Sequence, residues 1–367
     1  MASKFSLERR TYRHIILEGT AYAAGQMLGR LHKQDPRFSL FCSAADFSPA
    51  QFGFTDLRSL QTALERLCPG LNEEIAGFCD ACEVPPEKAF HYLASSAAVA
   101  GCSHMVIHPS ITQDGHVYVG RSYELNPADE DLCLVTSHIQ GKARHIGFST
   151  LFIGRLDGIN EYGVIITMSA GITPTEREKR RGFDFWVYTR AVLDRCRSVS
   201  EALDLLKETA LNCYTIFLIA DPSGEAALVE IAGSRRAIRR LSHTEPYLIA
   251  NNHYSLPEMQ ADNLGRDLSF STSRREAVQK WLDVNQPMLT PKVLKAILSI
   301  EYPNGCFCPY YNKGFGTLWS MVFDAGVTNV QLTFGAPTHN PWRTFGLDGE
   351  VGVTDYQAVL PSKIEKS

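Results

Sequence analysis

The sequence predicts a protein of the α/β class (α+β in its layout), in which sheets are covered by helices and a helical segment comes first. Residues 18–34, 57–68 and 71–83 place apolar side chains at helical spacing, with a break at Pro69-Gly70. From residue 102 onward, short runs rich in β-branched and aromatic residues alternate with further helical stretches. No internal repeat or low-complexity linker divides the 367 residues, so we expect one structural domain.

The second part of the chain supplies the expected strands and helices. The strands are the runs 103–108, 116–125, 163–169, 215–221, 226–232 and 246–252, bounded by turn signals such as Asp221-Pro222-Ser223-Gly224. The helices are 183–196, 199–210, 272–284 and 290–299. Ser198 and Glu201 have the spacing of a capping box, and Thr290 precedes a proline at the first helical position, which marks two of the helix starts.

Composition excludes several classes of function. The chain has 44% hydrophobic residues, and its 36 Lys and Arg against 40 Asp and Glu give a net charge of −4, so it lacks the basic footprint of a nucleic-acid-binding protein. No stretch is apolar for long enough to span a membrane, and the first twenty residues do not have the pattern of a secretory signal. The ten cysteines occur without an N-glycosylation sequon, which favours reduced thiols and a cytoplasmic location.

Common catalytic and metal motifs are absent or incomplete. There is no G-x-S-x-G, Walker, H-E-x-x-H or dinucleotide signature, and we expect no cofactor and no metal. Cys79 and Cys82 form a C-x-x-C pair, and Cys306 and Cys308 form a C-x-C pair; they build a zinc site only if the two pairs meet in space. Otherwise they are buried thiols. The basic run 177–181 and the arginines at 235, 236, 239 and 240 are expected to form ordinary surface ion pairs, and His243 is expected to be structural.

The junction Gly101-Cys102-Ser103 is the most informative part of the sequence. If 102–107 and 116–121 are antiparallel strands joined by 108–115, Cys102 faces Arg121, which favours a thiolate. Gly101 fits a backbone that needs unusual dihedral angles, as a self-cleaving peptide bond would. Cleavage before Cys102 would free an α-amine with an ordinary pKa of about 7.7–8.0, which can take the thiol proton at neutral pH.

A wider pattern surrounds this junction. It comprises Gly19, Gly25 and Gly29, the segment from Pro69 to Gly77, Gly101-Cys102-Ser103, Gly120-Arg121-Ser122-Tyr123-Glu124, the segment Gly158 to Val164, Asn251-Asn252-His253, Ser271 to Arg274, and Gly335-Ala336-Pro337. In order and spacing the chain resembles the N-terminal-nucleophile (Ntn) hydrolases, specifically the isopenicillin-N acyltransferase-like branch related to choloylglycine hydrolases.

This resemblance implies a four-layer αββα sandwich and an enzyme that cleaves itself. Residues 1–101 would become a helical small chain and residues 102–367 a large chain, which remain associated in one structural domain. Cys102 would be the nucleophile, Arg121 would lie beside it, and Glu124 would contact the new α-amine. Asn252, or Asn251, would supply an oxyanion donor, and Arg274 would be a second guanidinium in the site.

Two departures from the family's usual pattern bear on the site. The segment after Gly120 usually reads R-N-x-D, and here Ser122 and Glu124 replace the asparagine and the aspartate. The strand after Gly163 often carries an asparagine or a tyrosine that lines the pocket, and Ser169 is the nearest polar residue here. Ser122, Ser169 and Asn251 are therefore the expected substrate-binding residues, for a pocket that differs from that of the relatives.

The expected function is hydrolysis of a linear amide C–N bond through a thioester acyl-enzyme. An acyltransferase that moves an acyl group from a thioester or amide donor to a small-molecule amine is the alternative within enzymes. An uncleaved, non-catalytic protein of the same fold also stays open, because Cys102 can be a core thiol, Arg121 and Glu124 an ion pair, and Asn251-Asn252 a strand-ending turn. The expected partner is a small-molecule acyl amide or thioester, with no nucleic acid and no membrane, and with a possible homo-oligomer.

Overall fold

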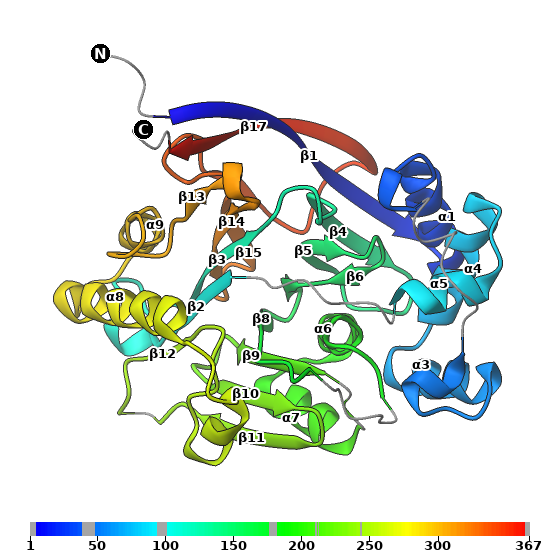
Figure 1. The fold of residues 1–367 in the computed structure, drawn as a ribbon, viewed down its shortest axis with the longest axis horizontal. Coiled ribbons are helices and arrows are strands. Elements are labelled where there is room, and N and C mark those ends of the chain that lie inside the picture. Colours follow the sequence, from blue (N-terminus) through cyan, green and yellow to red (C-terminus); the bar gives the residue numbers. More distant parts are fainter. Residues whose placement is uncertain are drawn as a thin grey trace.

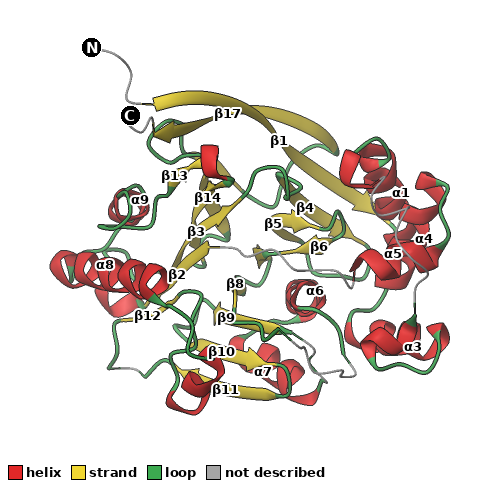
Figure 2. Cartoon of the chain, viewed as in Figure 1, coloured by secondary structure: helices red, strands yellow, loops and turns green. Residues whose placement is uncertain are grey.

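A computed structural model describes residues 5–38, 48–93, 101–175, 182–209, 211, 213–242 and 244–363. The basic run 177–181, His243 and the residue before Gly101 lie outside these ranges. Two sheets occupy the middle of the molecule and helices lie outside them, as Figures 1 and 2 show.

The strands and helices follow one another along the whole described chain. The strands are β1 (Phe5–Gly19), β2 (Gly101–Ile107), β3 (Tyr118–Leu125), β4 (Cys133–Ile139), β5 (His145–Thr150), β6 (Gly154–Arg155), β7 (Asp157–Asn160), β8 (Ile165–Ala170), β9 (Tyr214–Ala220), β10 (Ala226–Ala232), β11 (Arg235–Arg240), β12 (Tyr247–Ala250), β13 (Pro309–Tyr310), β14 (Phe315–Asp324), β15 (Asn329–Phe334), β16 (Arg343–Phe345) and β17 (Gly352–Lys363). The α-helices are α1 (Ala21–His32), α3 (Leu57–Leu67), α4 (Leu71–Cys82), α5 (Pro86–Leu93), α6 (Phe185–Arg195), α7 (Val199–Glu208), α8 (Ser269–Asn285) and α9 (Pro291–Leu298). The expected helix starts at Ser198 and Thr290 are confirmed, since both side chains accept a hydrogen bond from the first turn.

The larger sheet has the order β11-β10-β9-β8-β7-β5-β4-β1-β17, and only β8, β9 and β10 of its strands were predicted from the sequence. The first part of the chain was expected to be helical, but Phe5–Gly19 forms β1, a strand that pairs antiparallel with β17 and parallel with β4. The expectation of helices holds from Ala21 onward. A strand from the start of the chain therefore lies inside the sheet that the rest of the chain builds.

The smaller sheet has the order β12-β2-β3-β14-β15-β16 and carries the Gly101-Cys102 junction at the start of β2. The register differs from the expected one, because Cys102 lies opposite Tyr123 and Arg121 lies opposite His104. The shift is two residues, so it leaves Cys102 and Arg121 on the same face of the sheet as diagonal neighbours. The connection between β2 and β3, expected over residues 108–115, contains a 3₁₀ turn at Pro109–Ile111.

Alternation along β2 and β3 divides their side chains between two cores. Even-numbered residues of β2, including Cys102 and Val106, join the core between the two sheets. Met105 and Ile107 instead pack with residues of α8 and α9, such as Val278 and Leu298, in a second core. Helices α6 and α7 cover the other face of the larger sheet. These layers form the expected αββα sandwich.

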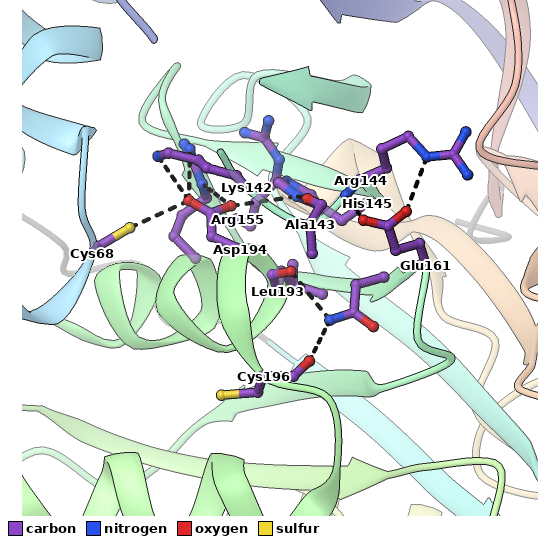
Figure 3. Close-up of polar contacts among 12 residues, drawn as sticks. Cys68, Lys142, Ala143, Arg144, His145, Arg155, Glu161, Leu193, Asp194 and Cys196 are labelled. Carbon is purple, nitrogen blue, oxygen red and sulfur yellow. Dashed lines mark hydrogen bonds and ion pairs between the residues drawn. The ribbon is translucent and has the colours of Figure 1, made fainter. Parts of the chain in front are cut away.

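The helices of the first hundred residues gather at one side of the molecule, away from α8 and α9 (Figure 1). A buried cluster of charges joins them to α6 and to the loop before β5. Glu74 on α4 accepts two hydrogen bonds from the guanidinium of Arg190, of 3.0 and 2.7 Å. Asp194 accepts from Lys142 Nζ at 2.9 Å and from Cys68 Sγ at 3.3 Å, as Figure 3 shows. These contacts connect residues before Gly101 with residues after it.

In the part of the chain that the structure describes, no helix is both long and apolar enough to cross a membrane.

Candidate active site

Cys102 is the second residue of β2, and its side chain is fully buried between the two sheets. Its backbone nitrogen donates a 2.8 Å hydrogen bond to Oδ1 of Asn252, which follows β12. Its carbonyl oxygen accepts a 3.2 Å hydrogen bond from Nδ2 of Asn251. The two asparagines therefore hold the backbone on both sides of the Cys102 Cα.

Glu124 and Arg274 lie on the other face of the smaller sheet, toward α8. Glu124 is directly opposite Gly101, and its Oε2 is 3.3 Å from Nη1 of Arg274. Its Oε1 accepts hydrogen bonds from the hydroxyls of Ser122 and Thr317. Both side chains of the ion pair are fully buried. The junction backbone thus separates the thiol on one face from a buried carboxyl and guanidinium on the other.

Arg274 connects this ion pair to the asparagine that holds Cys102. Its Nη2 donates to Asn252 Oδ1 at 2.9 Å and its Nη1 donates to Ser103 Oγ at 3.0 Å. Asn252 Nδ2 donates to the carbonyl of Ala170 at 3.0 Å. The expected oxyanion donor therefore uses its oxygen on Cys102 N and its NH₂ group on β8 in this uncleaved chain.

Arg121 is held by a carboxylate that sequence reasoning missed. Its Nε is 2.5 Å from Oδ2 of Asp157 on β7, and its Nη1 donates to the carbonyl of Met168 on β8. Arg121 and Asp157 are both fully buried. The guanidinium thus bridges the two sheets beside Cys102. Asp157 opens the short strand Asp157–Asn160, which also contains the polar Asn160, so the sequence carried no clear signal for it.

In the uncleaved chain, the pKa values keep the thiol of Cys102 protonated at neutral pH and let the carboxyl of Glu124 exchange its proton. Burial raises the pKa of the Cys102 thiol to about 11, although Arg121 and Arg274 act in the opposite direction. The expected bias toward thiolate is therefore wrong for this state, because loss of water outweighs the two guanidinium charges. Burial also raises the pKa of Glu124 to about 7, against the opposing effect of Arg274. A carboxyl in that range exchanges protons readily at neutral pH.

The three expected substrate-binding residues are buried and make contacts within the protein. Ser122 donates to Glu124, and Ser169 Oγ donates to the carbonyl of Asn251 at 2.5 Å. Ser169 also lies 3.2 Å from Nε2 of His104, which joins β2 to β8. Asn251 Nδ2 donates to Ser103 Oγ, whereas its buried Oδ1 has no hydrogen-bond partner among the described residues. Their role toward a substrate stays a prediction.

Close packing, rather than an unusual backbone, disfavours a side chain at position 101. It lies in the extended backbone of β2, so the expected unusual dihedral angles are not the reason for a glycine here. A Cβ built at this position would lie 2.6 Å from Cζ of Phe315 and 3.0 Å from Cβ of Glu124. Phe315, like Thr317 and Asp157, was not identified from the sequence.

The cysteine pairs considered for zinc belong to different parts of the molecule. Cys79 and Cys82 lie on α4, and Cys306 and Cys308 lie close to Glu124 and Arg274. Within the described ranges, no group of three or more His, Cys, Asp or Glu side chains is placed to hold a metal ion. A hollow of about 780 Å³ between α3, α6 and α7 is lined by none of the expected site residues.

The αββα sandwich and a match to a protein-family model assign this protein to the class of Ntn-type acyltransferases and amidohydrolases. The chain belongs to the family described as acyl-coenzyme A:6-aminopenicillanic acid acyl-transferase, whose model matches residues 111–339, more than half of the chain. The matched region includes Arg121, Glu124, Asn252 and Arg274 and begins after Cys102.

Individual relatives are distant. An uncharacterized protein of Archaeoglobus fulgidus is 22% identical over 181 residues, which is 43% of this chain and 30% of that protein, so the match spans less than a third of the relative's length. Penicillin V acylase from Agrobacterium tumefaciens is similar in structure with a TM-score of 0.43 and 16% identity, covering 64% of this chain and 83% of that one. An N-acylethanolamine-hydrolyzing acid amidase ortholog of Caenorhabditis elegans has a TM-score of 0.45 and 18% identity, covering 61% and 93%.

Proposed function

We propose that this protein is a self-processing amidohydrolase in which the thiol of Cys102 is the nucleophile. The observation that carries the proposal is the hydrogen bond of 2.8 Å from Cys102 N to Asn252 Oδ1, directly after the Gly101 carbonyl. If the Gly101–Cys102 bond breaks, this nitrogen becomes an α-amine that already has a hydrogen-bond acceptor. The substrate class is a small molecule or short peptide with a linear amide bond.

Processing would follow the chemistry of an acyl shift from nitrogen to sulfur. Cys102 Sγ attacks the carbonyl carbon of Gly101, the C–N bond breaks, and the thiol proton ends on the Cys102 nitrogen. Water then attacks the thioester, which yields the carboxylate of Gly101 and restores the thiol. Turnover repeats these two steps with the carbonyl of an amide substrate in place of Gly101.

Different groups would handle the proton before and after cleavage. In the uncleaved chain the pKa of Cys102 is about 11, and Glu124, with a pKa of about 7, lies against Gly101 on the far side of the bond. We assign Glu124 the proton exchange with the departing nitrogen. After cleavage, the α-amine of Cys102 is adjacent to its own thiol and serves as the base. Arg121 and Arg274 stabilise negative charge at the sulfur, since both act to lower the pKa of the thiol.

The asparagines would serve the reacting carbonyl. Asn252 remains the proposed oxyanion donor of the processed enzyme, which requires its Nδ2 to leave the carbonyl of Ala170. Asn251 is proposed to contact substrate, because its buried Oδ1 is an acceptor that no described residue uses. Ser122 would position Glu124, and Ser169 would position Asn251 through its backbone carbonyl.

An acyltransferase is the second candidate, and the family description favours it because it names an acyl-coenzyme A donor and an amine acceptor. The same thioester at Cys102 would then be attacked by the amine of a small molecule instead of by water. Exclusion of water from the site decides between the two outcomes.

The first experiment compares the wild type with Cys102→Ala and with Cys133→Ala, a matched change of a buried cysteine on β4. Intact mass and N-terminal sequencing should show two chains in the wild type and in Cys133→Ala, the larger beginning at Cys102, and one chain in Cys102→Ala. One chain in all three proteins would contradict the proposal and favour a non-catalytic protein of the same fold.

A second experiment separates hydrolysis from transfer. The processed protein is incubated with a panel of acyl amides and acyl thioesters, with and without hydroxylamine or a candidate amine. A hydrolase releases free acid at a rate that the amine hardly changes. An acyltransferase forms the new amide at the expense of the acid.

A further inference from the structure

We propose that Phe315 is a positioning residue that restricts residue 101 to glycine and fixes the peptide bond before Cys102. This inference rests on the proposed self-processing. It concerns a residue at the start of β14, more than two hundred positions away in the sequence, whose ring lies against the Gly101 backbone.

The contact is steric, because a side chain at position 101 would overlap the tip of the half-buried Phe315 ring and force the ring or the strand to shift. A Cβ there would lie 2.6 Å from Phe315 Cζ, 3.0 Å from Glu124 Cβ and 3.3 Å from Glu124 Oε2. Carbon atoms in ordinary contact lie at about 3.5–4.0 Å. Gly101 has strand geometry and pairs with Glu124. A change of backbone dihedral angles that moved an alanine Cβ away from these atoms would therefore break the pairing of β2 with β3.

Neighbouring groups hold the Phe315 ring in place. Phe315 pairs with Tyr310 of β13 and packs edge-on against Phe270 with ring centroids 5.6 Å apart. Phe270 is itself covered by the guanidinium of Arg274 at 4.4 Å from the ring centroid, and Arg274 binds Glu124. The ring and the carboxylate that flank Gly101 therefore belong to one connected set of contacts.

This arrangement fixes the bond from both ends. Phe315 and Glu124 restrain residue 101, whereas Asn252 holds the nitrogen of residue 102. Attack by a neighbouring thiol depends strongly on such placement, since a shift of about 1 Å can cost about 100-fold in rate. Phe315 would act through the Gly101 backbone and not on the reacting atoms.

The test is a size-complementation experiment on the full chain. Gly101→Ala should slow processing by about 100-fold relative to the wild type. Phe315→Leu removes the ring tip, so the double variant Gly101→Ala/Phe315→Leu should be processed at least about 10-fold faster than Gly101→Ala. Phe315→Leu alone, with Gly101 retained, should not be processed faster than the wild type. Phe270→Leu, in the same aromatic cluster but not among the nearest contacts of Gly101, is the matched control and should not rescue Gly101→Ala.

Stability measured without processing separates folding from positioning. In the Cys102→Ala background, thermal unfolding should show that Gly101→Ala lowers Tm and that Phe315→Leu restores part of the loss. Two results would overturn the role of Phe315 and leave the proposed function standing. One is a Gly101→Ala chain that is processed at the wild-type rate. The other is a slow Gly101→Ala chain whose rate of processing Phe315→Leu does not increase. An uncleaved wild type would overturn both.

Discussion

The backbone nitrogen of Cys102 donates a hydrogen bond of 2.8 Å to Oδ1 of Asn252, a residue 150 positions further along the chain. Asn252 Oδ1 also accepts from Arg274 Nη2 at 2.9 Å. One amide oxygen therefore joins the junction backbone, the loop after β12 and helix α8. The nitrogen that would become an α-amine is positioned by a group that is already paired with a positive charge.

Replacing Asn252 with alanine should slow the appearance of the large chain by about 10–100-fold. The buried donors Cys102 N and Arg274 Nη2 would both lose their acceptor, and leaving a buried donor unpaired costs about 1–3 kcal/mol. Asn252→Asp retains an oxygen at this place and should be less impaired. Gel time courses after synthesis measure the rate. Asn340→Ala removes hydrogen bonds to Val359 elsewhere in the molecule and should process like the wild type.

Loss of the Asp157 charge should destabilise the fold strongly. Asp157→Asn leaves the fully buried guanidinium of Arg121 without its counter-ion, at an expected cost of about 3–5 kcal/mol in the free energy of unfolding. Guanidinium chloride titration of the uncleaved Cys102→Ala chain measures it. Asp355→Asn, which breaks the exposed pair with Arg13, should cost less than about 1 kcal/mol. Equal effects of the two substitutions would contradict the assignment.

The Glu74–Arg190 pair should hold the two chains together after processing. Glu74→Gln removes the negative charge from a bidentate, fully buried ion pair. The small and large chains of the cleaved protein should therefore dissociate at a lower denaturant concentration than in the wild type. Size-exclusion chromatography in increasing urea follows the small chain. Glu73→Gln changes an exposed neighbour on the same helix and should leave the midpoint unchanged. A midpoint that Glu74→Gln does not alter would exclude this role.

Glu130 should make the protein less stable as pH rises. Burial, aided by Asp131, raises the pKa of Glu130 to about 8 from 4.5, and its Oε1 accepts a 2.5 Å hydrogen bond from Tyr123. Between pH 4.5 and pH 8, the carboxyl of Glu130 is therefore protonated in the folded state and ionised in the unfolded state. Stability contributed by this proton is complete below pH 4.5 and is lost as pH rises through 8, by up to about 1.4 kcal/mol per pH unit.

Urea unfolding of the uncleaved Cys102→Ala chain at pH 5, 6, 7 and 8 tests the sign. Glu130→Gln should flatten the decline with pH. Glu124, with its pKa raised to about 7, contributes a decline of the same sign below pH 7 that this substitution leaves in place. An identical slope with and without Glu130 would show that its carboxyl does not titrate as described.

Part of the architecture could be predicted from local patterns. The strands β2, β3, β8, β9, β10 and β12 and the helices α6 to α9 follow apolar periodicity, turn residues and caps, which depend on neighbours in the sequence. The strands β4 to β7, β11 and β13 to β17 were not predicted. Strand β1 escaped because its first half is mostly exposed and charged, as in Glu8, Arg9 and Arg10, and it is held by pairing with a strand from the far end of the chain. Because the stabilising partner is so distant in the sequence, the local sequence shows no alternation of apolar and polar residues that would indicate a strand.

Strand pairing and residue type pointed to Cys102 and Arg121, whereas Glu124, Asn252 and Arg274 were expected from the resemblance to a known family, and the roles of all five residues stay predictions. Cys102, Arg121, Glu124 and Arg274 have side chains that suggest nucleophile or charge. Asp157 and Phe315 matter only because folding brings them to Arg121 and Gly101. The direct partner of Cys102 was also misplaced, because the length of a connection with a 3₁₀ turn does not determine the register of the strands it joins.

Strand β1 pairs with β4 on one side and β17 on the other, so the larger sheet is complete only when the first segment of the chain has been inserted. Cutting the chain before Cys102 would leave β1 in place but end its covalent connection. Refolding would then change from a unimolecular to a bimolecular process. The mature protein, once denatured and diluted, should recover in a concentration-dependent way that its precursor does not show, so its lifetime would depend on its rate of unfolding rather than on its ability to refold.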